Sequence, residues 1–159
     1  MTEVHQVEAS GDASWLHVGV AVASWNRSIT DNLLRGAVDR LEDLGVERVT
    51  VIRVPGSLEL PTAAAALIHH GCDAVVALGT IVKGDTDHYA IVSRESARGL
   101  TLVASETGAP VANGILAVHD IALAVERSQP GPSNKGYEAA TAGVEMALAL
   151  EALATGAAQ

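Results

Sequence analysis

The sequence predicts an α/β fold of three layers, in which a mainly parallel sheet carries helices on both faces. Apolar runs typical of strands alternate with helical stretches along nearly the whole chain. These runs are almost continuously apolar, as expected for strands buried on both faces. Aromatic residues make up only 3% of the chain and Phe is missing, so Ala, Val and Leu must fill the interior. Such small side chains suit close packing of helices on a sheet.

The first half of the chain predicts two strand–helix units. The apolar run 15–23 predicts the first strand, and a helix follows from Ser28, as its N-cap, to Leu44. Gly45 then ends this helix, because glycine readily adopts the left-handed conformation that follows a helix. Residues 48–54 predict the second strand, and residues 60–70 an Ala-rich helix.

The second half continues the alternation and ends in a long helix. Helical periodicity and β-rich runs distinguish the two kinds of element. In chain order we predict a strand, a helix, two further strands and two helices, over residues 73–78, 88–98, 100–104, 111–118, 120–128 and 135–155. No internal repeat or linker interrupts them, so we expect one domain over residues 15–159 and a flexible N-terminal arm over residues 1–14.

Composition and charge limit the classes of function. The net charge of −9 leaves no basic stripe for nucleic acid and no polybasic surface for a membrane. No apolar run is long enough to span a bilayer, and residues 1–14 do not resemble a secretory signal, so we expect a cytoplasmic protein. The single cysteine, Cys72, excludes an internal disulfide and is expected to be a small buried side chain.

The strongest functional signal is the loop over residues 79–89, Gly-Thr-Ile-Val-Lys-Gly-Asp-Thr-Asp-His-Tyr, which follows a buried strand and precedes a helix. Such loops lie at the carboxyl edge of an open parallel sheet, where ligands bind. Backbone N–H groups at a helix start favour anions. His88, at the same place, can exchange a proton near neutral pH. An anion cradle beside a proton shuttle indicates an enzyme that acts on a small phosphorylated molecule.

Other loops at the same edge carry polar or aromatic candidates. Trp25 is either a packing residue or a platform for a flat heterocycle. Glu59 either complements the dipole of its helix or accepts hydrogen bonds from substrate hydroxyls. Asn113 lies in an apolar strand, where its amide needs a partner from the backbone or from a ligand. Arg127 and Lys135 are either solvated surface charges or phosphate ligands.

Several common sites have no signature in the chain. No pair of His and carboxylate residues has the spacing of a metal-ligand set. No Gly-x-Gly-x-x-Gly fingerprint follows the first strand, which disfavours a dinucleotide site, and no Gly-x-Ser-x-Gly elbow indicates a hydrolase.

The ordered set of motifs resembles the 6,7-dimethyl-8-ribityllumazine synthase family over about residues 16–150. The loop with His88 is the most specific of them. The matching segments are Trp25-Asn26, residues 55–61 (Pro-Gly-Ser-Leu-Glu-Leu-Pro), residues 79–89, residues 110–116 (Pro-Val-Ala-Asn-Gly-Ile-Leu), Arg127 and residues 134–140 (Asn-Lys-Gly-Tyr-Glu-Ala-Ala).

The resemblance implies a flavodoxin-like fold and a condensation of 5-amino-6-(D-ribitylamino)uracil with 3,4-dihydroxy-2-butanone 4-phosphate, with release of phosphate and water. It implies no metal and no organic cofactor. His88 would move protons. Phosphate ligands would be Gly84, Asp85, Thr86 and Arg127. The pyrimidinedione and ribityl chain would contact Trp25, Asn26, Ser57, Leu58, Glu59, Thr80, Ile81, Val82, Asn113 and Lys135.

The resemblance also implies an assembly. Family active sites lie between adjacent subunits of a homopentamer, and some members form a 60-subunit icosahedral shell; the chain is compatible with either, and association with riboflavin synthase is a further expectation. Ala90 stands where the family usually has an acidic residue, and Asp87 where Pro is frequent. Two alternatives therefore stay open, a non-catalytic lumazine- or flavin-binding carrier or shell protein, and an unrelated phosphate-ligand sensor.

Overall fold

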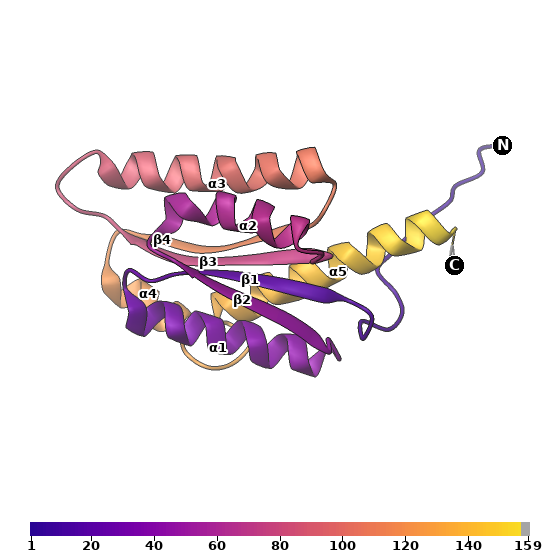
Figure 1. Ribbon diagram of the computed structural model, residues 1–159, viewed down its shortest axis with the longest axis horizontal. Helices are drawn as coiled ribbons and strands as arrows, with labels where there is room; N and C mark the ends of the chain where they lie inside the picture. Colours follow the sequence, from indigo (N-terminus) through magenta and orange to yellow (C-terminus); the bar gives the residue numbers. More distant parts are fainter. Residues whose placement is uncertain (157–159) are drawn as a thin grey trace.

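A computed structural model describes residues 1–156 and contains one parallel sheet (Figure 1). Its spatial order is β2-β1-β3-β4. The strands are β1 (His17–Ala23), β2 (Arg48–Val54), β3 (Ala74–Val82) and β4 (Val111–Val118). All three pairings are parallel, and Val20 of β1 lies opposite Val51 of β2 and Val76 of β3. The predicted α/β class with a parallel sheet is confirmed.

Helices cover both faces of this sheet, as the three-layer flavodoxin-like arrangement requires (Figure 1). One face carries α1 (Arg27–Asp43), α4 (Ile121–Arg127) and α5 (Lys135–Thr155). The other face carries α2 (Leu60–His69) and α3 (His88–Thr107), and the short 3₁₀ turn η1 (Ser57–Glu59) precedes α2. None of the described helices is long and apolar enough to cross a membrane.

Two apolar layers hold the helices to the sheet. Side chains of β3 alternate between them, because successive strand residues point to opposite faces. Val76 faces the α1–α5 side, where Leu33 and Val144 pack. Val75 faces the α2–α3 side with Leu60 and Leu100. Every residue of β1 is buried, so the centre of the sheet is a fixed platform for the loops at its edge.

The predicted strand over residues 100–104 was wrong, because α3 runs unbroken from His88 to Thr107. Buried residues of α3 recur at Val92, Ser96 and Leu100, which is the spacing of one helical face. Gly99 lets this face approach α2, since a Cβ there would lie 2.5 Å from Cγ of Pro61. Packing on α2 and the sheet therefore outweighs the β-propensity of this apolar run.

The start of α1 also differs from the prediction. The N-cap is Asn26 rather than Ser28, and its backbone is left-handed with φ 58°. Asn is among the few residues that tolerate this conformation. The backbone oxygen of Asn26 accepts hydrogen bonds from the N–H groups of Ile29 and Thr30. The predicted end of the helix at Gly45 is confirmed, with φ +82°.

Residues 1–14 form no helix or strand, and they lead away from the sheet to an N-terminus beyond the end of α5 (Figure 1). Their flexibility, and the division into an arm and a domain over residues 15–159, stay predictions. The last three residues of that predicted domain, 157–159, lie outside the described residues.

Candidate functional site

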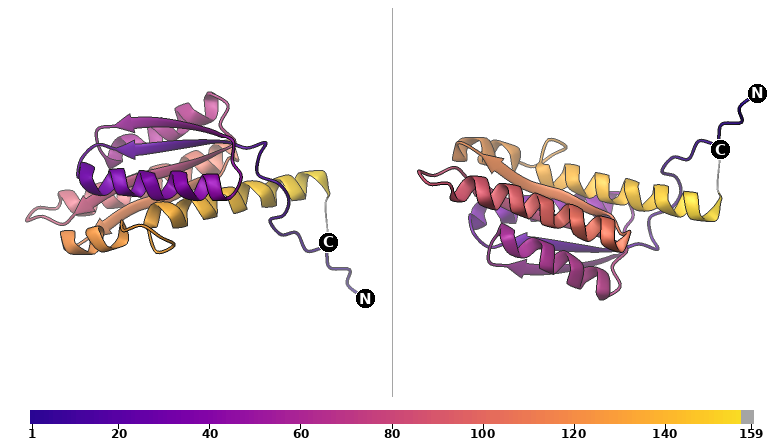
Figure 2. Two further views of the ribbon diagram at one scale, coloured as in Figure 1. Left: turned by 90° about the horizontal axis from the view of Figure 1, so that it is seen from below. Right: turned by 90° about the horizontal axis from the view of Figure 1, so that it is seen from above.

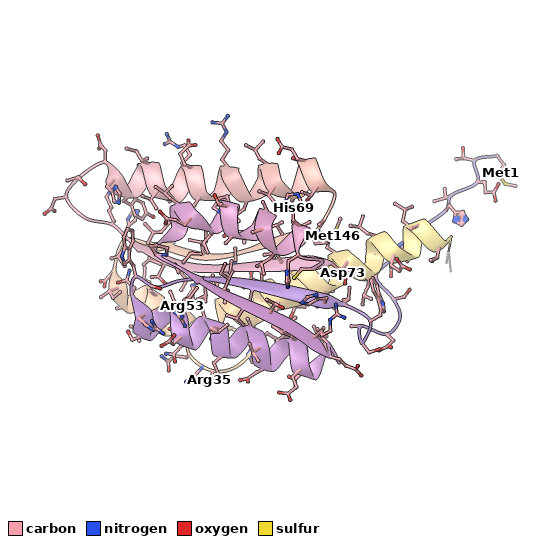
Figure 3. The ribbon with its side chains drawn as sticks, viewed as in Figure 1. Met1, Arg35, Arg53, His69, Asp73 and Met146 are labelled. Carbon is pink, nitrogen blue, oxygen red and sulfur yellow. The ribbon has the colours of Figure 1, made fainter. Side chains whose placement is uncertain are left out.

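The carboxyl ends of β1, β2 and β3 and the start of α3 surround a cavity of about 170 Å³. Ten residues line it: Ala23, Trp25, Asn26, Gly56, Ser57, Thr80, Ile81, Val82, His88 and Val92. Seven of these ten were predicted as site residues. The loop after β3 projects at this end of the sheet, whereas His69 and Asp73 lie toward the other end of the strands (Figure 3).

Backbone hydrogen bonds tie the loops after β1 and β2 together. The N–H of Ser24 donates to the oxygen of Val54 at 2.8 Å, and the N–H of Trp25 donates to the oxygen of Pro55 at 3.1 Å. The Trp25 ring lies against Gly56, where a Cβ would come within 2.6 Å of ring carbon Cε3. Trp25 is 62% exposed, so within the described chain it is not a core residue. A large ring fixed at its backbone and open on one face suits stacking on a flat heterocycle.

Thr80 and Asn26 form the floor between β1 and β3. The amide Nδ2 of Asn26 donates to the backbone oxygen of Thr80 at 3.2 Å. The Thr80 hydroxyl is buried and has no hydrogen-bond partner among residues 1–156. An unpaired buried hydroxyl costs about 1–3 kcal/mol, which favours a ligand that bonds to it.

The turn after β2 places Glu59 beside the cavity. Its Oε2 accepts a hydrogen bond from the N–H of Gly56 at 3.0 Å, and the carboxylate is exposed. Ser57 is buried against Gly79, where a Cβ would lie 2.5 Å from the serine hydroxyl. Leu58 is exposed. Leu58 and Glu59 thus flank the cavity without lining it.

The loop between β3 and α3 is exposed from Lys83 to His88. The Thr86 hydroxyl accepts a hydrogen bond from the backbone N–H of His88 at 3.3 Å. His88 lines the cavity, whereas Gly84, Asp85 and Thr86 do not. The first turn of α3 contains no acidic residue, so no carboxylate of that turn lies beside His88.

Asn113, Arg127 and Lys135 do not line the cavity. Asn113 is exposed on β4, and its Oδ1 accepts from the N–H of Ile115 at 2.9 Å. Arg127 is exposed in the last turn of α4 and takes part in none of the ion pairs among residues 1–156. The Nζ of Lys135 lies 2.9 Å from Oε1 of Glu138. The structure therefore separates these three predicted residues from the other half of the site.

Asn134 links the two cation-bearing segments. Its buried Nδ2 donates to the oxygens of Ser128, at 2.9 Å, and of Asn32, at 3.2 Å. Its Oδ1 accepts from the N–H groups of Gly136 and Tyr137, at 2.8 and 3.2 Å. One side chain thus joins the end of α4 to the start of α5 and both to α1.

Three residues that line the cavity were missed from the sequence: Ala23, Gly56 and Val92. Val92 lies one helical turn after His88, a spacing that the sequence already contained. Gly56 was identified as part of a break, but its contact with Trp25 depends on the pairing of β1 with β2. Ala23 offered no chemical signal.

Comparison with known proteins decides the family. The 6,7-dimethyl-8-ribityllumazine synthase family model matches residues 15–151. The chain belongs to this family. It is 43% identical over 157 residues to a 6,7-dimethyl-8-ribityllumazine synthase of Sodalis glossinidius, covering 96% of this chain and 99% of that protein. A protein of the same name from Thermococcus gammatolerans is 43% identical over 146 residues, covering 91% and 94% of the two chains. Another from Kineococcus radiotolerans is 44% identical over 149 residues, covering 92% of each chain.

The family match bears on the alternatives raised by the sequence. Membership of this family does not favour the carrier or the unrelated sensor. The similarity covers nearly the entire chain, and the relatives are named as enzymes. The cavity also lies among the segments that carried the resemblance, at the ends of β1, β2 and β3. In residues 1–156, no group of three or more His, Cys, Asp or Glu side chains is arranged to hold a metal ion.

Proposed function

We propose that this protein catalyses the reaction that names its family. It condenses the amine of 5-amino-6-(D-ribitylamino)uracil with the ketone of 3,4-dihydroxy-2-butanone 4-phosphate, as a transferase of riboflavin biosynthesis in the cytoplasm. The observation that carries the proposal is the cavity that brings Trp25 and His88 together at the carboxyl edge of the sheet. A flat ring and a phosphorylated ketone both find suitable partners there.

The roles proposed for the residues are those that the family resemblance implies. Trp25 stacks on the pyrimidinedione, and Asn26, Thr80, Ile81 and Val82 form the wall against its edge. Thr80, Ile81 and Val82 contact the heterocycle mainly through their backbone groups. Ser57, Leu58 and Glu59 contact the ribityl chain, where the exposed carboxylate accepts hydrogen bonds from its hydroxyls.

Phosphate binds at the loop between β3 and α3. Backbone N–H groups of Gly84, Asp85 and Thr86 precede the amino end of α3, where the helix dipole favours an anion. Asp85 and Asp87 oppose that anion, so a cation must offset them. Arg127 supplies it in this proposal, because a guanidinium matches phosphate oxygens with two parallel hydrogen bonds.

His88 moves protons between the two substrates. Amine attack on the ketone requires a proton to leave nitrogen and another to reach the departing oxygen. A histidine can do both near neutral pH, and such catalysis contributes about 10²–10⁴ in rate. Holding amine and ketone together supplies a further gain, because it replaces a bimolecular encounter.

A single chain provides too little of the site. The cavity of about 170 Å³ is smaller than the roughly 300 Å³ at which ligand pockets usually begin, and Asn113, Arg127 and Lys135 lie outside it. We therefore propose that an adjacent copy contributes these three residues in a homopentamer. An apolar groove of about 670 Å³ between α3 and α5, over the edge strand β4, offers that copy a docking surface.

The test of the reaction mixes both substrates with purified protein and follows lumazine absorbance. We expect formation well above the uncatalysed background, and a decrease of about 10²- to 10⁴-fold for His88→Ala. His69→Ala, an exposed histidine toward the other end of the strands, serves as the control. Background formation by the unaltered protein would refute the proposal.

The test of the shared site mixes two inactive variants. Co-refolded His88→Ala and Arg127→Ala chains should regain about one quarter of the activity, because one neighbouring pair in four combines both intact residues in a cyclic assembly. Each variant alone should stay inactive. Sedimentation must also give a mass near five or sixty times 16.3 kDa. Absence of complementation in a confirmed mixed oligomer would place the whole site in one chain.

A further inference from the structure

His119 has no role in the proposed reaction, yet its ring contacts the residue next to His88. The imidazole of His119 and the phenol ring of Tyr89 meet edge to face, with centroids 5.7 Å apart and an interplanar angle of 79°. Tyr89 is half-buried and directly follows His88, and His119 is the first residue after β4. This is the preferred geometry of an aromatic pair.

The neighbour of His119 holds the other end of the same loop. The backbone N–H of Lys83 donates to the oxygen of Val118 at 2.9 Å. Val118, the last residue of β4, thus holds Lys83, and His119, the next residue, holds Tyr89. Together they hold both ends of the segment 83–89. Both views of Figure 2 show this loop and α4, which follows His119, at the same end of the molecule.

Between these two anchors the loop has little other support. Residues 84–87 are exposed, and a Cβ at Gly84 would meet nothing within 4 Å. Asp87, the N-cap of α3, makes no side-chain capping bond. The hydrogen bond from the His88 N–H to the Thr86 hydroxyl lies within the loop and does not attach it to the sheet.

We infer that His119 is a positioning residue: through Tyr89 it holds His88 and the loop between β3 and α3 in place for the proposed reaction, on which the inference rests. The contact needs an aromatic edge and no charge. Phenylalanine at this position should therefore preserve it, whereas alanine should remove it. Because His119 is exposed, neither substitution opens a cavity in the core.

The experiment compares His119→Ala and His119→Phe, with His69→Ala as the matched control, by steady-state kinetics. Loss of the contact should lower kcat/KM for the phosphorylated ketone about 3- to 10-fold, the range expected for an aromatic pair, and leave KM for the ribitylaminouracil unchanged. His119→Phe should stay within about twofold of the unaltered protein. Equal kinetics for His119→Ala and the unaltered protein, or equal losses in both His119 variants, would overturn the inference.

A second readout does not depend on catalysis. Amide hydrogen exchange in residues 84–90 should be faster in His119→Ala by a similar factor, and should return to the original rate in His119→Phe. Unchanged exchange in His119→Ala would also overturn the inference. If the unaltered protein forms no lumazine, the proposed function fails, while the exchange rates still decide whether His119 holds the loop.

Discussion

Two regions at the same edge of the sheet are built in opposite ways. The loops after β1 and β2, residues 24–26 and 55–59, are tied to each other by backbone hydrogen bonds and by the packing of Trp25 on Gly56. The loop after β3 is exposed from Lys83 to His88 and is held at its two ends. We call the first region the ring wall and the second the phosphate loop.

The difference reflects what each region has to bind in the proposed reaction. Stacking on a rigid heterocycle favours a Trp25 ring that is already held in place, because ordering a mobile side chain on binding costs conformational entropy. A phosphate presents several equivalent oxygens, so backbone N–H groups can close around it from more than one starting position. The ring wall is therefore held in place within one chain, whereas the phosphate loop is exposed between its two anchors.

Removal of the Trp25 ring should have the largest effect on ligand binding of all the changes that compare the two regions. Trp25→Ala should weaken binding of the lumazine product about 5- to 150-fold, the range for loss of one stacked base. The free energy of unfolding should change little, because the ring is 62% exposed. Fluorescence titration measures the first quantity and thermal unfolding the second. Trp15→Ala, at the other tryptophan, is the control and should bind normally.

A pair of glycine substitutions tests the two regions directly. Gly56→Ala places a Cβ 2.6 Å from the Trp25 ring and must displace it, so product affinity should fall about 3- to 10-fold. Gly84→Ala meets no atom within 4 Å and should leave unchanged the affinity for inorganic phosphate, the ligand proposed for that loop. Isothermal titration of both variants measures the contrast. Similar losses at the two positions would mean that the ring wall is no more tightly built than the phosphate loop.

A smaller effect is expected within the phosphate loop. Thr86→Ala removes the exposed acceptor of the His88 N–H, and an exposed bond of this kind is worth about 0.5 kcal/mol, the lower end of the usual range, so kcat/KM should fall about twofold. Thr155→Ala is the control, since that hydroxyl also bonds to helix backbone but lies at the far end of α5, away from the loop. A loss above tenfold would show that the loop is rigid before the ligand binds.

The smallest effect on activity should come from the amino end of the sheet. Burial, followed by the charge of Asp73, raises the pKa of the Cys72 thiol. Folding therefore favours the neutral thiol, and this stabilisation is present below the ordinary thiol pKa of about 8.5 and is lost as the pH rises above it. Cys72→Ala should leave kcat unchanged and should flatten the decline of stability above that pH. Denaturant titrations from pH 7 to 10 measure the free energy of unfolding of both proteins.

Much of the fold follows from patterns that depend on near neighbours. The strands at residues 48–54 and 111–118 and the helix at residues 135–155 were predicted with the bounds that the structure gives. The end of α3 could not be predicted in this way. Leu100 and the residues after it suit a strand locally, and the packing of α3 on α2 and the sheet, which includes the close approach of Gly99 to Pro61, keeps them helical.

The candidate site could also be predicted only in part. The rule that loops gather at the carboxyl edge of a parallel sheet predicted that Trp25, Ser57, Thr80 and His88 would meet. It gave no reason to expect the close approach of Gly56, which depends on the register between β1 and β2. For Asn113, Arg127 and Lys135 the sequence offered the chemistry of their side chains and the resemblance, and one chain does not bring them to the cavity.

The buried amide of Asn134 has a consequence for how this sequence can change over evolutionary time. By bonding to Ser128 on one side and to Gly136 and Tyr137 on the other, it fixes both ends of the segment 129–133. That segment, Gln-Pro-Gly-Pro-Ser, can therefore drift in composition without moving Arg127 or Lys135.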